Sequence, residues 1–473
     1  MQARRLRRWT CLGWASALLI AVVLAGSGTA ASAGPLAQLR RQPYLTDLLQ
    51  RHVIVNWSTT TVVSRAWVRY GKVRSGSCTA HRVDALRKLI VVGTTREHQW
   101  RASLDGLNPN TRYCYRIYGD GAGLLGHSRA PRFRTQVKHG ATAPFSFAVL
   151  GDWGAVDANG QNPDQAAVLH QIAQSPARFA VTTGDTAYPS GSQRNYGDLV
   201  QHGPDTSAVF GPSFWARAGS SIALFNAQGN HGLNRTSLVN WPQRRATFSS
   251  GGRYRMRRYC CVNHTSPGRY PSAWYAFDAG LARFYVLQAA WPNGNLGTAD
   301  MYRNDHDVHW RTSSAEMRWL RHDLRTHRRR VSFAFFHFPL YADGATEGSD
   351  PWLQGPRHLE GVLGKHGVDI VFNGHAHIYE RNARSSRGMP ISYVTGGGGG
   401  KLQPVSRCGP LDRYAIGWAY SAHTHGSACG SAAAPSSIDH VFHYLLVRVH
   451  GRSVKVVPTD ETGRTFDVMH YRF

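Results

Sequence analysis

Acidic residues are scarce in this chain of 473 residues, which has 28 aspartates and glutamates against 55 lysines and arginines. The formal net charge is therefore +27. A surface this basic attracts phosphate esters, nucleic acid or an anionic cell envelope alike. No arginine-rich motif singles out nucleic acid, so we expect no specific nucleic-acid partner. Contact with an anionic cell envelope stays open.

Long apolar runs are absent outside the N-terminus. Four arginines stand within the first eight residues, ahead of an apolar stretch over about residues 12–24 and small residues up to Ala33. This layout is typical of a secretory signal peptide over residues 1–33. A membrane anchor, the alternative, needs ~20 apolar residues. We therefore expect a secreted protein, extracellular or periplasmic, with no transmembrane span after signal removal and a net charge of +23 once the four arginines leave.

Cysteine is rare as well, with 7 in the chain. Removing Cys11 with the signal peptide leaves an even number in an oxidising location, which suits disulfides better than metal binding. Fifteen pairings are open. The pairs that would stay within one domain are Cys78 with Cys114 and Cys408 with Cys429.

Residues 40–137 alternate apolar and polar side chains in short runs such as HVIVNWS and RYCYRIYG. Strands of this length and spacing are typical of a β-sandwich. The stretch LDGLNPNTRYCYRI resembles a fibronectin type III-like domain, in which such a turn places a tyrosine at a strand corner. That tyrosine is Tyr113 or Tyr115, and we expect an all-β fibronectin type III-like sandwich over 40–137.

From about residue 144, apolar runs alternate with helical patterns, which predicts an α/β layered domain over residues 144–473. Helices are expected at 164–174 and 313–326, and in the second of these Ser313 and Glu316 have the spacing of a capping box. Two further segments predict antiparallel strand pairs, at 273–289 and 441–460.

Five apolar runs in this region are each followed by side chains that can coordinate a metal ion or take part in proton transfer. Ligand sites in α/β sheets gather beyond the carboxyl ends of the strands, so we expect these residues to lie together. The set contains no cysteine and is larger than one tetrahedral zinc requires, which predicts two adjacent cations that share a carboxylate. Its members are Asp152, Asp185, Tyr188, Asn230, His231, His337, His375 and His377.

The blocks GDWG, GDTAY, GNH, AFFH and GHAH resemble, in this order, the five blocks of the purple acid phosphatases. The resemblance spans most of the chain and includes a sandwich ahead of a calcineurin-like metallophosphoesterase domain. It implies that this domain is a β-sandwich core flanked by helices. It also implies two metal sites bridged by Asp185, the first held by Asp152, Asp185, Tyr188 and His377, and the second by Asp185, Asn230, His337 and His375.

The ligand types bear on the metals that this resemblance implies. Two carboxylates and a phenolate favour Fe(III) in the first site, whereas the neutral ligands of the second suit a divalent ion, which could be iron, zinc or manganese. The family activity implied is that of an acid phosphatase, a phosphoric ester hydrolase that cleaves phosphate monoesters by attack of a metal-bound hydroxide. His231 resembles the family histidine that hydrogen-bonds the phosphoryl group or the leaving oxygen.

The loop HFPLYADGATEGSD departs from the family pattern, because it lacks the one or two further histidines expected there. Glu347 is then a candidate acid, which would require a raised pKa, or else a surface carboxylate. This departure leaves open a phosphodiesterase or nucleotide-cleaving activity on the same scaffold. An envelope-binding protein with a vestigial site is a further alternative, although the complete ligand set argues against it. The glycine run at 396–400 lacks phosphate-loop spacing, and we interpret it as close backbone packing near the site.

Overall fold

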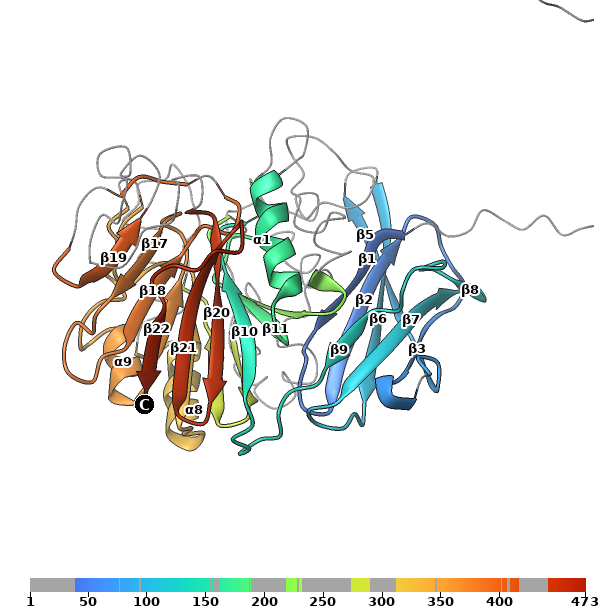
Figure 1. The fold of residues 1–473 in the computed structure, drawn as a ribbon, viewed down its shortest axis with the longest axis horizontal. Coiled ribbons are helices and arrows are strands. Elements are labelled where there is room, and N and C mark those ends of the chain that lie inside the picture. The colour runs from blue at the N-terminus through green and yellow to red at the C-terminus, as the bar shows by residue number, and fades with distance from the viewer. Residues whose placement is uncertain are drawn as a thin grey trace, which may run out of the picture. The chain divides into compact units, whose positions relative to one another are not determined.

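The computed structural model describes residues 39–473 (Figure 1), with gaps in that range. The expected signal peptide and the Cys408–Cys429 pair lie outside the described residues. Residues Ala37–Phe473 cluster as one unit. The gaps are residues 76, 93–94, 154, 156–161, 187, 189–217, 228, 232–273, 290–311, 345–346, 401, 406–408 and 417–440.

The N-terminal part is all-β, as the alternating pattern predicted. One layer has the strand order β1-β2-β6-β5, and the other has β4-β3-β7-β8 with β9 on β7. Trp57 and Tyr115 lie in the core between them, at most 1% exposed. The bounds are β1 Leu39–Thr46, β2 His52–Thr59, β3 Ala66–Lys72, the 3-10 helix η1 Val73–Ser75, β4 His81–Asp84, β5 Leu86–Val92, β6 Thr95–Asp105, β7 Arg112–Gly119, β8 Ala122–Gly123 and β9 Arg132–Arg134.

Tyr113 is the strand-corner tyrosine. Its hydroxyl oxygen accepts a hydrogen bond from the backbone N–H of Asn108 at 2.9 Å, which is the contact expected of a tyrosine corner. Tyr115 instead donates its hydroxyl to the carbonyl oxygen of Ser220, at 2.8 Å. The expected disulfide between Cys78 and Cys114 is confirmed.

The second part consists of two sheets, and all five predicted apolar runs form strands in them. Three runs are the parallel strands β10, β11 and β12 of a ten-strand sheet, which continues through β12 into the N-terminal layer β1-β2-β6-β5. Its full order is β22-β21-β20-β10-β11-β12-β1-β2-β6-β5 (Figure 1). The other two are β15 and β16 of a second sheet, ordered β13-β14-β15-β16-β18-β17-β19. The bounds are β10 Phe145–Leu150, β11 Phe179–Thr182, β12 Ala223–Asn226, β13 Tyr275–Ala279, β14 Ala282–Val286, β15 Val331–Phe335, β16 Ile370–Asn373, β17 Tyr379–Asn382, β18 Ile391–Thr395, β19 Asp412–Ile416, β20 His443–His450, β21 Ser453–Asp460 and β22 Met469–Arg472.

A phenylalanine core joins these two sheets. Phe147 of β10 meets Phe284 of β14 edge-on at 5.0 Å between ring centroids. Phe225 of β12 stacks on Phe277 of β13 at 3.9 Å. These rings are fully buried, so the apolar strands are held face to face by aromatic packing. The domain is therefore the expected layered β-sandwich, and the apolar faces of its described helices pack against the sheets on the sides away from this phenylalanine core.

Three helices have described bounds: α1 Pro163–Gln174, α8 Ala315–Thr326 and α9 Leu359–Lys365. The first two confirm the predicted helices. The predicted capping box is wrong by one residue, because Ser314 is the N-cap and its hydroxyl accepts from the N–H of Met317 at 3.2 Å. Glu316 instead accepts a hydrogen bond from the N–H of Gln288, at 2.8 Å. None of the helices in the described ranges combines the length and apolarity that crossing a bilayer requires.

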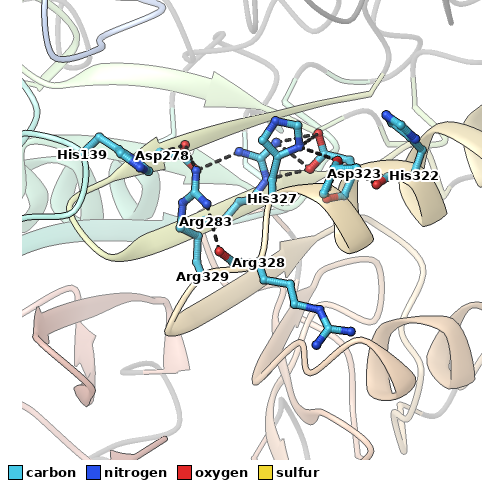
Figure 2. Close-up of polar contacts among 9 residues, drawn as sticks. His139, Asp278, Arg283, His322, Asp323, His327, Arg328 and Arg329 are labelled. Atoms are coloured by element: carbon cyan, nitrogen blue, oxygen red, sulfur yellow. Dashed lines mark hydrogen bonds and ion pairs between the residues drawn. The ribbon is translucent and has the colours of Figure 1, made fainter.

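A buried ion-pair network fastens α8 to the β13–β14 hairpin (Figure 2). Arg283 of β14 makes a bidentate contact with Asp323 of α8, at 2.7 and 2.6 Å. Its remaining Nη1 binds Asp278 at 2.8 Å, and Arg329 binds the other oxygen of Asp278 at 3.0 Å. Both side chains of the central pair are only 1% exposed, so each charge depends on the other for its solvation.

Candidate metal centre

Four predicted metal ligands have a left-handed backbone conformation. The φ angles are 53° at Asp152, 45° at Asp185, 72° at His375 and 50° at His377, and only four other non-glycine residues in the described chain share this conformation. Such a backbone costs about 1–3 kcal/mol per residue and is concentrated at functional sites. Each of the four lies in the turn just after a strand, so the strained turns position these side chains beyond the strand ends.

The glycine run at 396–400 packs against these turns. A Cβ on Gly396 would lie 2.6 Å from the backbone nitrogen of His377, closer than side-chain atoms approach. The N–H of Gly400 donates to the carbonyl oxygen of Asp152 at 2.6 Å. The interpretation of this run as close backbone packing near the site is therefore confirmed.

One group of side chains surrounds Tyr188. Its hydroxyl donates to Asp185 Oδ2 at 3.2 Å and lies 3.0 Å from His377 Nε2. His377 Nε2 in turn lies 3.4 Å from Asp152 Oδ1. These four residues are the set predicted for the first metal site, and the structure brings their ligand atoms together.

A second group surrounds His337. Its Nε2 lies 2.6 Å from Asn230 Oδ1 and 3.3 Å from Asp185 Oδ2. His375, the fourth predicted ligand of this site, has its ring centroid 5.1 Å from that of His337 and 4.3 Å from that of Phe338. Asp185 thus contacts members of both groups, as a bridging ligand would.

The donor atoms fit bound cations in both type and spacing. Two ligands bound at about 2.1 Å to one ion, at right angles to each other, are about 3 Å apart, and the contacts above range from 2.6 to 3.4 Å. One ligand atom each from Asp152, Asp185 and His337 lie within 4.8 Å of one another, and all three residues are buried. The Nδ2 of Asn230 is buried and has no hydrogen-bond partner among the described residues, while its Oδ1 faces His337.

The charges in this cluster depend on one another. Burial raises the pKa of Asp185, but the charges of His337 and His231 outweigh burial and hold it below its usual value. Burial lowers the pKa of His337, but Asp185 and Asp152 outweigh it and raise that pKa to about 9. The carboxylates therefore require nearby positive charge, which protonated imidazole or a bound cation would provide.

Thr183 orients one of the ligands, and the sequence did not draw attention to it. The Nδ1 of His337 donates to the carbonyl oxygen of Thr183 at 2.9 Å, which directs Nε2 toward Asn230 and Asp185. A hydrogen bond of this kind fixes the tautomer and the ring orientation of a metal-binding histidine. The only available signal was the position of Thr183 directly before the Gly-Asp pair at the end of β11.

His231 lies at the edge of the centre. Its backbone N–H donates to Asp185 Oδ1 at 2.9 Å, and its Nε2 lies 3.9 Å from Asp185 Oδ2. The ring packs on Tyr188 with centroids 4.4 Å apart, and 28% of the side chain stays exposed. This places an imidazole beside the centre that a ligand from solvent can reach.

Glu347 faces the same centre. Burial raises the pKa of Glu347, and the charges of Asp152 and Asp185 add to this, while His377 opposes it. Its Oε2 is buried without a hydrogen-bond partner among the described residues. Asp343, from the same loop, instead accepts from the N–H of Gly409. The predicted raised pKa is therefore present, and the catalytic role of Glu347 stays a prediction.

Comparison with known proteins agrees with this geometry. Residues 42–135 match the N-terminal domain of purple acid phosphatases, and residues 145–379 match the calcineurin-like phosphoesterases. The chain is similar to purple acid phosphatase 18 of Arabidopsis thaliana, with 25% identity over 375 residues, which cover 76% of this chain and 70% of that protein.

Two further similarities come from a human protein and a solved structure. Human acid phosphatase type 7 is 26% identical over 391 residues, which cover 79% of this chain and 76% of the human protein. The structure of purple acid phosphatase PPD1 from yellow lupin seeds matches 91% of this chain and 74% of its own, with a TM-score of 0.64 and 15% identity. At that identity the likeness establishes the fold alone.

Proposed function

This chain belongs to the purple acid phosphatase family, and we propose that it hydrolyses phosphate monoesters at a dinuclear centre built on Asp185. The observation that carries the proposal is the pair of donor groups that meet at this one buried carboxylate. A single ion would leave one group unused. Membership of the family already identifies the chain as a metallophosphoesterase and an acid phosphatase. What the proposal adds is the substrate class and the number of metal ions.

The two donor groups would hold different ions. Asp152, Asp185, Tyr188 and His377 would bind a trivalent iron, since they include two carboxylates and a phenol. Asn230, His337 and His375, with the shared Asp185, would bind a divalent iron, zinc or manganese ion. When bound, two such cations supply Lewis acidity toward a phosphoryl oxygen and lower the pKa of a water molecule.

Residues of the protein itself have three tasks in this proposal. Thr183 keeps the His337 ring oriented, and the strained turns at Asp152 and Asp185 keep the carboxylates in place. His231, which is partly exposed beside Tyr188, hydrogen-bonds the phosphoryl group or the leaving oxygen. Glu347 can carry a proton because its pKa is raised, which makes it the second candidate for protonating the leaving oxygen.

A phosphodiester is the alternative substrate, and a specific observation favours it. The loop with Glu347 provides no imidazole beyond His337, where the family pattern has further histidines. A diester carries one charge fewer than a monoester, so it needs fewer cationic groups around its phosphoryl oxygens. The two substrate classes are therefore distinguished by the charge that this loop presents.

We also propose that the protein acts outside the cytoplasm. The arginine-rich, apolar and small-residue segments of the first 33 residues support export. The disulfide between Cys78 and Cys114 supports an oxidising compartment. The high net positive charge would favour contact with an anionic cell envelope there.

Paired substrates test the proposal directly. Metal-loaded protein is assayed on p-nitrophenyl phosphate and on bis-p-nitrophenyl phosphate, with Fe(III) and each divalent ion supplied in turn. A kcat/KM at least about 10-fold higher for the monoester supports monoester hydrolysis. The opposite preference assigns the diester instead. If neither substrate is hydrolysed with any of the metals, both the monoester and the diester assignment are refuted.

A further inference from the structure

An arginine-lined cavity of about 460 Å³ lies away from the candidate metal centre. Its walls come from β7 and β9 of the N-terminal sandwich and from the segments that lead into β10, β11 and β12. Apolar side chains such as Phe133 and Ile222 form part of the lining. The four charged residues of the lining are Arg112, Arg132, Arg134 and Arg178.

The cavity and the metal centre occupy opposite edges of the same sheet. Ser146 of the lining lies near the start of β10, and Arg178 and Ile222 directly precede β11 and β12. The predicted metal ligands follow the carboxyl ends of these strands. A six-residue strand such as β10 is about 20 Å long, so a ligand in the cavity is separate from the centre.

The charge of this cavity is not balanced by carboxylates. No aspartate or glutamate is part of the lining. Within the described ranges, none of the four guanidinium groups forms an ion pair. Arg112 of β7 is directly opposite Arg134 of β9 in the strand register, and like charges in that position destabilise a sheet. The protein thus keeps an arrangement that costs stability unless an anion offsets it.

Arg178 is the most buried of the four arginines, at 8% exposure. Its guanidinium donates to the carbonyl oxygens of Thr135 and Pro144 at 3.1 and 3.3 Å, which uses two of its five N–H donors. Burial and the charges of Arg134 and Arg112 lower the pKa of Arg178 to about 10, so it stays charged at neutral pH. Removing a charged guanidinium from water without a counter-ion is unfavourable, and a bound anion would remove that penalty.

We propose that this cavity binds a phosphate-type oxyanion with at least two negative charges, separately from the metal centre. Guanidinium groups bind phosphate oxygens in a bidentate manner, and Arg112, Arg134 and Arg178 approach one site from three separate segments. The cavity is larger than one phosphate needs. It therefore accommodates free phosphate, a polyphosphate, or the phosphate group of an organic ester whose remainder contacts the apolar wall.

The binding test compares two charge-matched double variants by titration calorimetry with inorganic phosphate. R112Q/R134Q removes two guanidinium groups from the cavity. R69Q/R448Q removes two positive charges from exposed strand positions outside it. The holoenzyme should bind phosphate at two sites, R112Q/R134Q should lose one of them with at least a 10-fold drop in affinity, and R69Q/R448Q should keep both.

The cavity is distinguished from the metal centre by Asp185→Asn. This variant should still bind phosphate at the cavity, whether or not the proposed hydrolysis is correct. Tripolyphosphate and glycerol phosphate, titrated in the same background, separate a polyphosphate ligand from an ester. Absence of binding by all three probes would overturn the proposal, and so would equal binding by Asp185→Asn with and without R112Q/R134Q.

Melting temperatures distinguish anion binding from a purely structural role of the arginines. If the cavity binds an anion, R112Q/R134Q should melt in anion-free buffer at the same temperature as the wild type or higher, because the double variant relieves like-charge repulsion. Phosphate should then raise the melting temperature of Asp185→Asn, but not that of Asp185→Asn combined with R112Q/R134Q. A double variant that melts lower in anion-free buffer and responds to phosphate like its parent would contradict the proposal.

Discussion

Asp323→Asn tests the buried network of Figure 2, in which Asp323 is the bidentate partner of Arg283. The change leaves the Arg283 charge at 1% exposure with Asp278, 20% exposed, as its remaining carboxylate partner among the described residues. Breaking a buried pair costs about 3–5 kcal/mol, and the remaining contact at 2.8 Å places the expected loss near the lower end, about 3 kcal/mol.

That loss can be expressed as a melting temperature. Unfolding entropy is about 2.1 cal/mol/K per residue, so a unit of about 400 residues loses about 4 °C for 3 kcal/mol. Differential scanning calorimetry measures this shift. Asp278→Asn is the control, because removing this more exposed carboxylate should lower the stability less. The apolar pair Arg283→Met with Asp323→Leu should recover most of the stability that Asp323→Asn loses. An unchanged melting temperature in Asp323→Asn would refute the view that this pair fastens α8 to the hairpin.

Further outcomes follow from the site and from the partly buried carboxyl of Asp369. Tyr188→Phe should remove the visible absorption band of the oxidised iron form. If the variant keeps this band, Tyr188 is not a phenolate ligand. His231→Ala should keep both metals and lower kcat/KM by about 10²-fold, and a larger loss on alkyl phosphates than on p-nitrophenyl phosphate would mark protonation of the leaving group by His231. Glu347→Gln is measured on the same substrates. A loss of kcat/KM in Glu347→Gln that is confined to alkyl phosphates would assign the protonation to Glu347. Burial raises the pKa of Asp369 to about 6, so the folded protein loses stability as pH rises from about 4 to 6. Asp369→Asn should thus be more stable by about 1–2 kcal/mol at pH 7.5 and equal at pH 4, as chemical denaturation at both values would show.

The strands and their terminal residues could be predicted because local patterns encode them. Phe179–Thr182 is a four-residue apolar run bounded by polar residues, and β11 has these bounds. The division of five runs between two sheets could not be predicted, because strand partners are chosen by packing across the phenylalanine core. The capping error at Ser313 has a similar cause, since Glu316 is held by the N–H of Gln288, which is distant in sequence.

The ligand set was predictable for a different reason. Aspartate, asparagine and histidine directly after apolar strands are visible in the sequence, and the left-handed turns bring them together. Thr183 acts through its backbone carbonyl, which any residue possesses, so its type carried no signal. The arginine cavity joins β9 to the segment before β11, and nothing in either stretch alone indicates the other.

The central claim is that Asp185 bridges two metal ions. The most direct measurement is the metal content per chain, by inductively coupled plasma mass spectrometry, of the wild type, Asp185→Asn and the control Asp343→Asn. Asp343, in the neighbouring loop, accepts a hydrogen bond from the N–H of Gly409 and belongs to neither predicted ligand group. We predict two metals per chain in the wild type and in Asp343→Asn, and at most one in Asp185→Asn, with phosphatase activity reduced about 10³-fold or more. Two metals and an undiminished rate in Asp185→Asn would contradict the account.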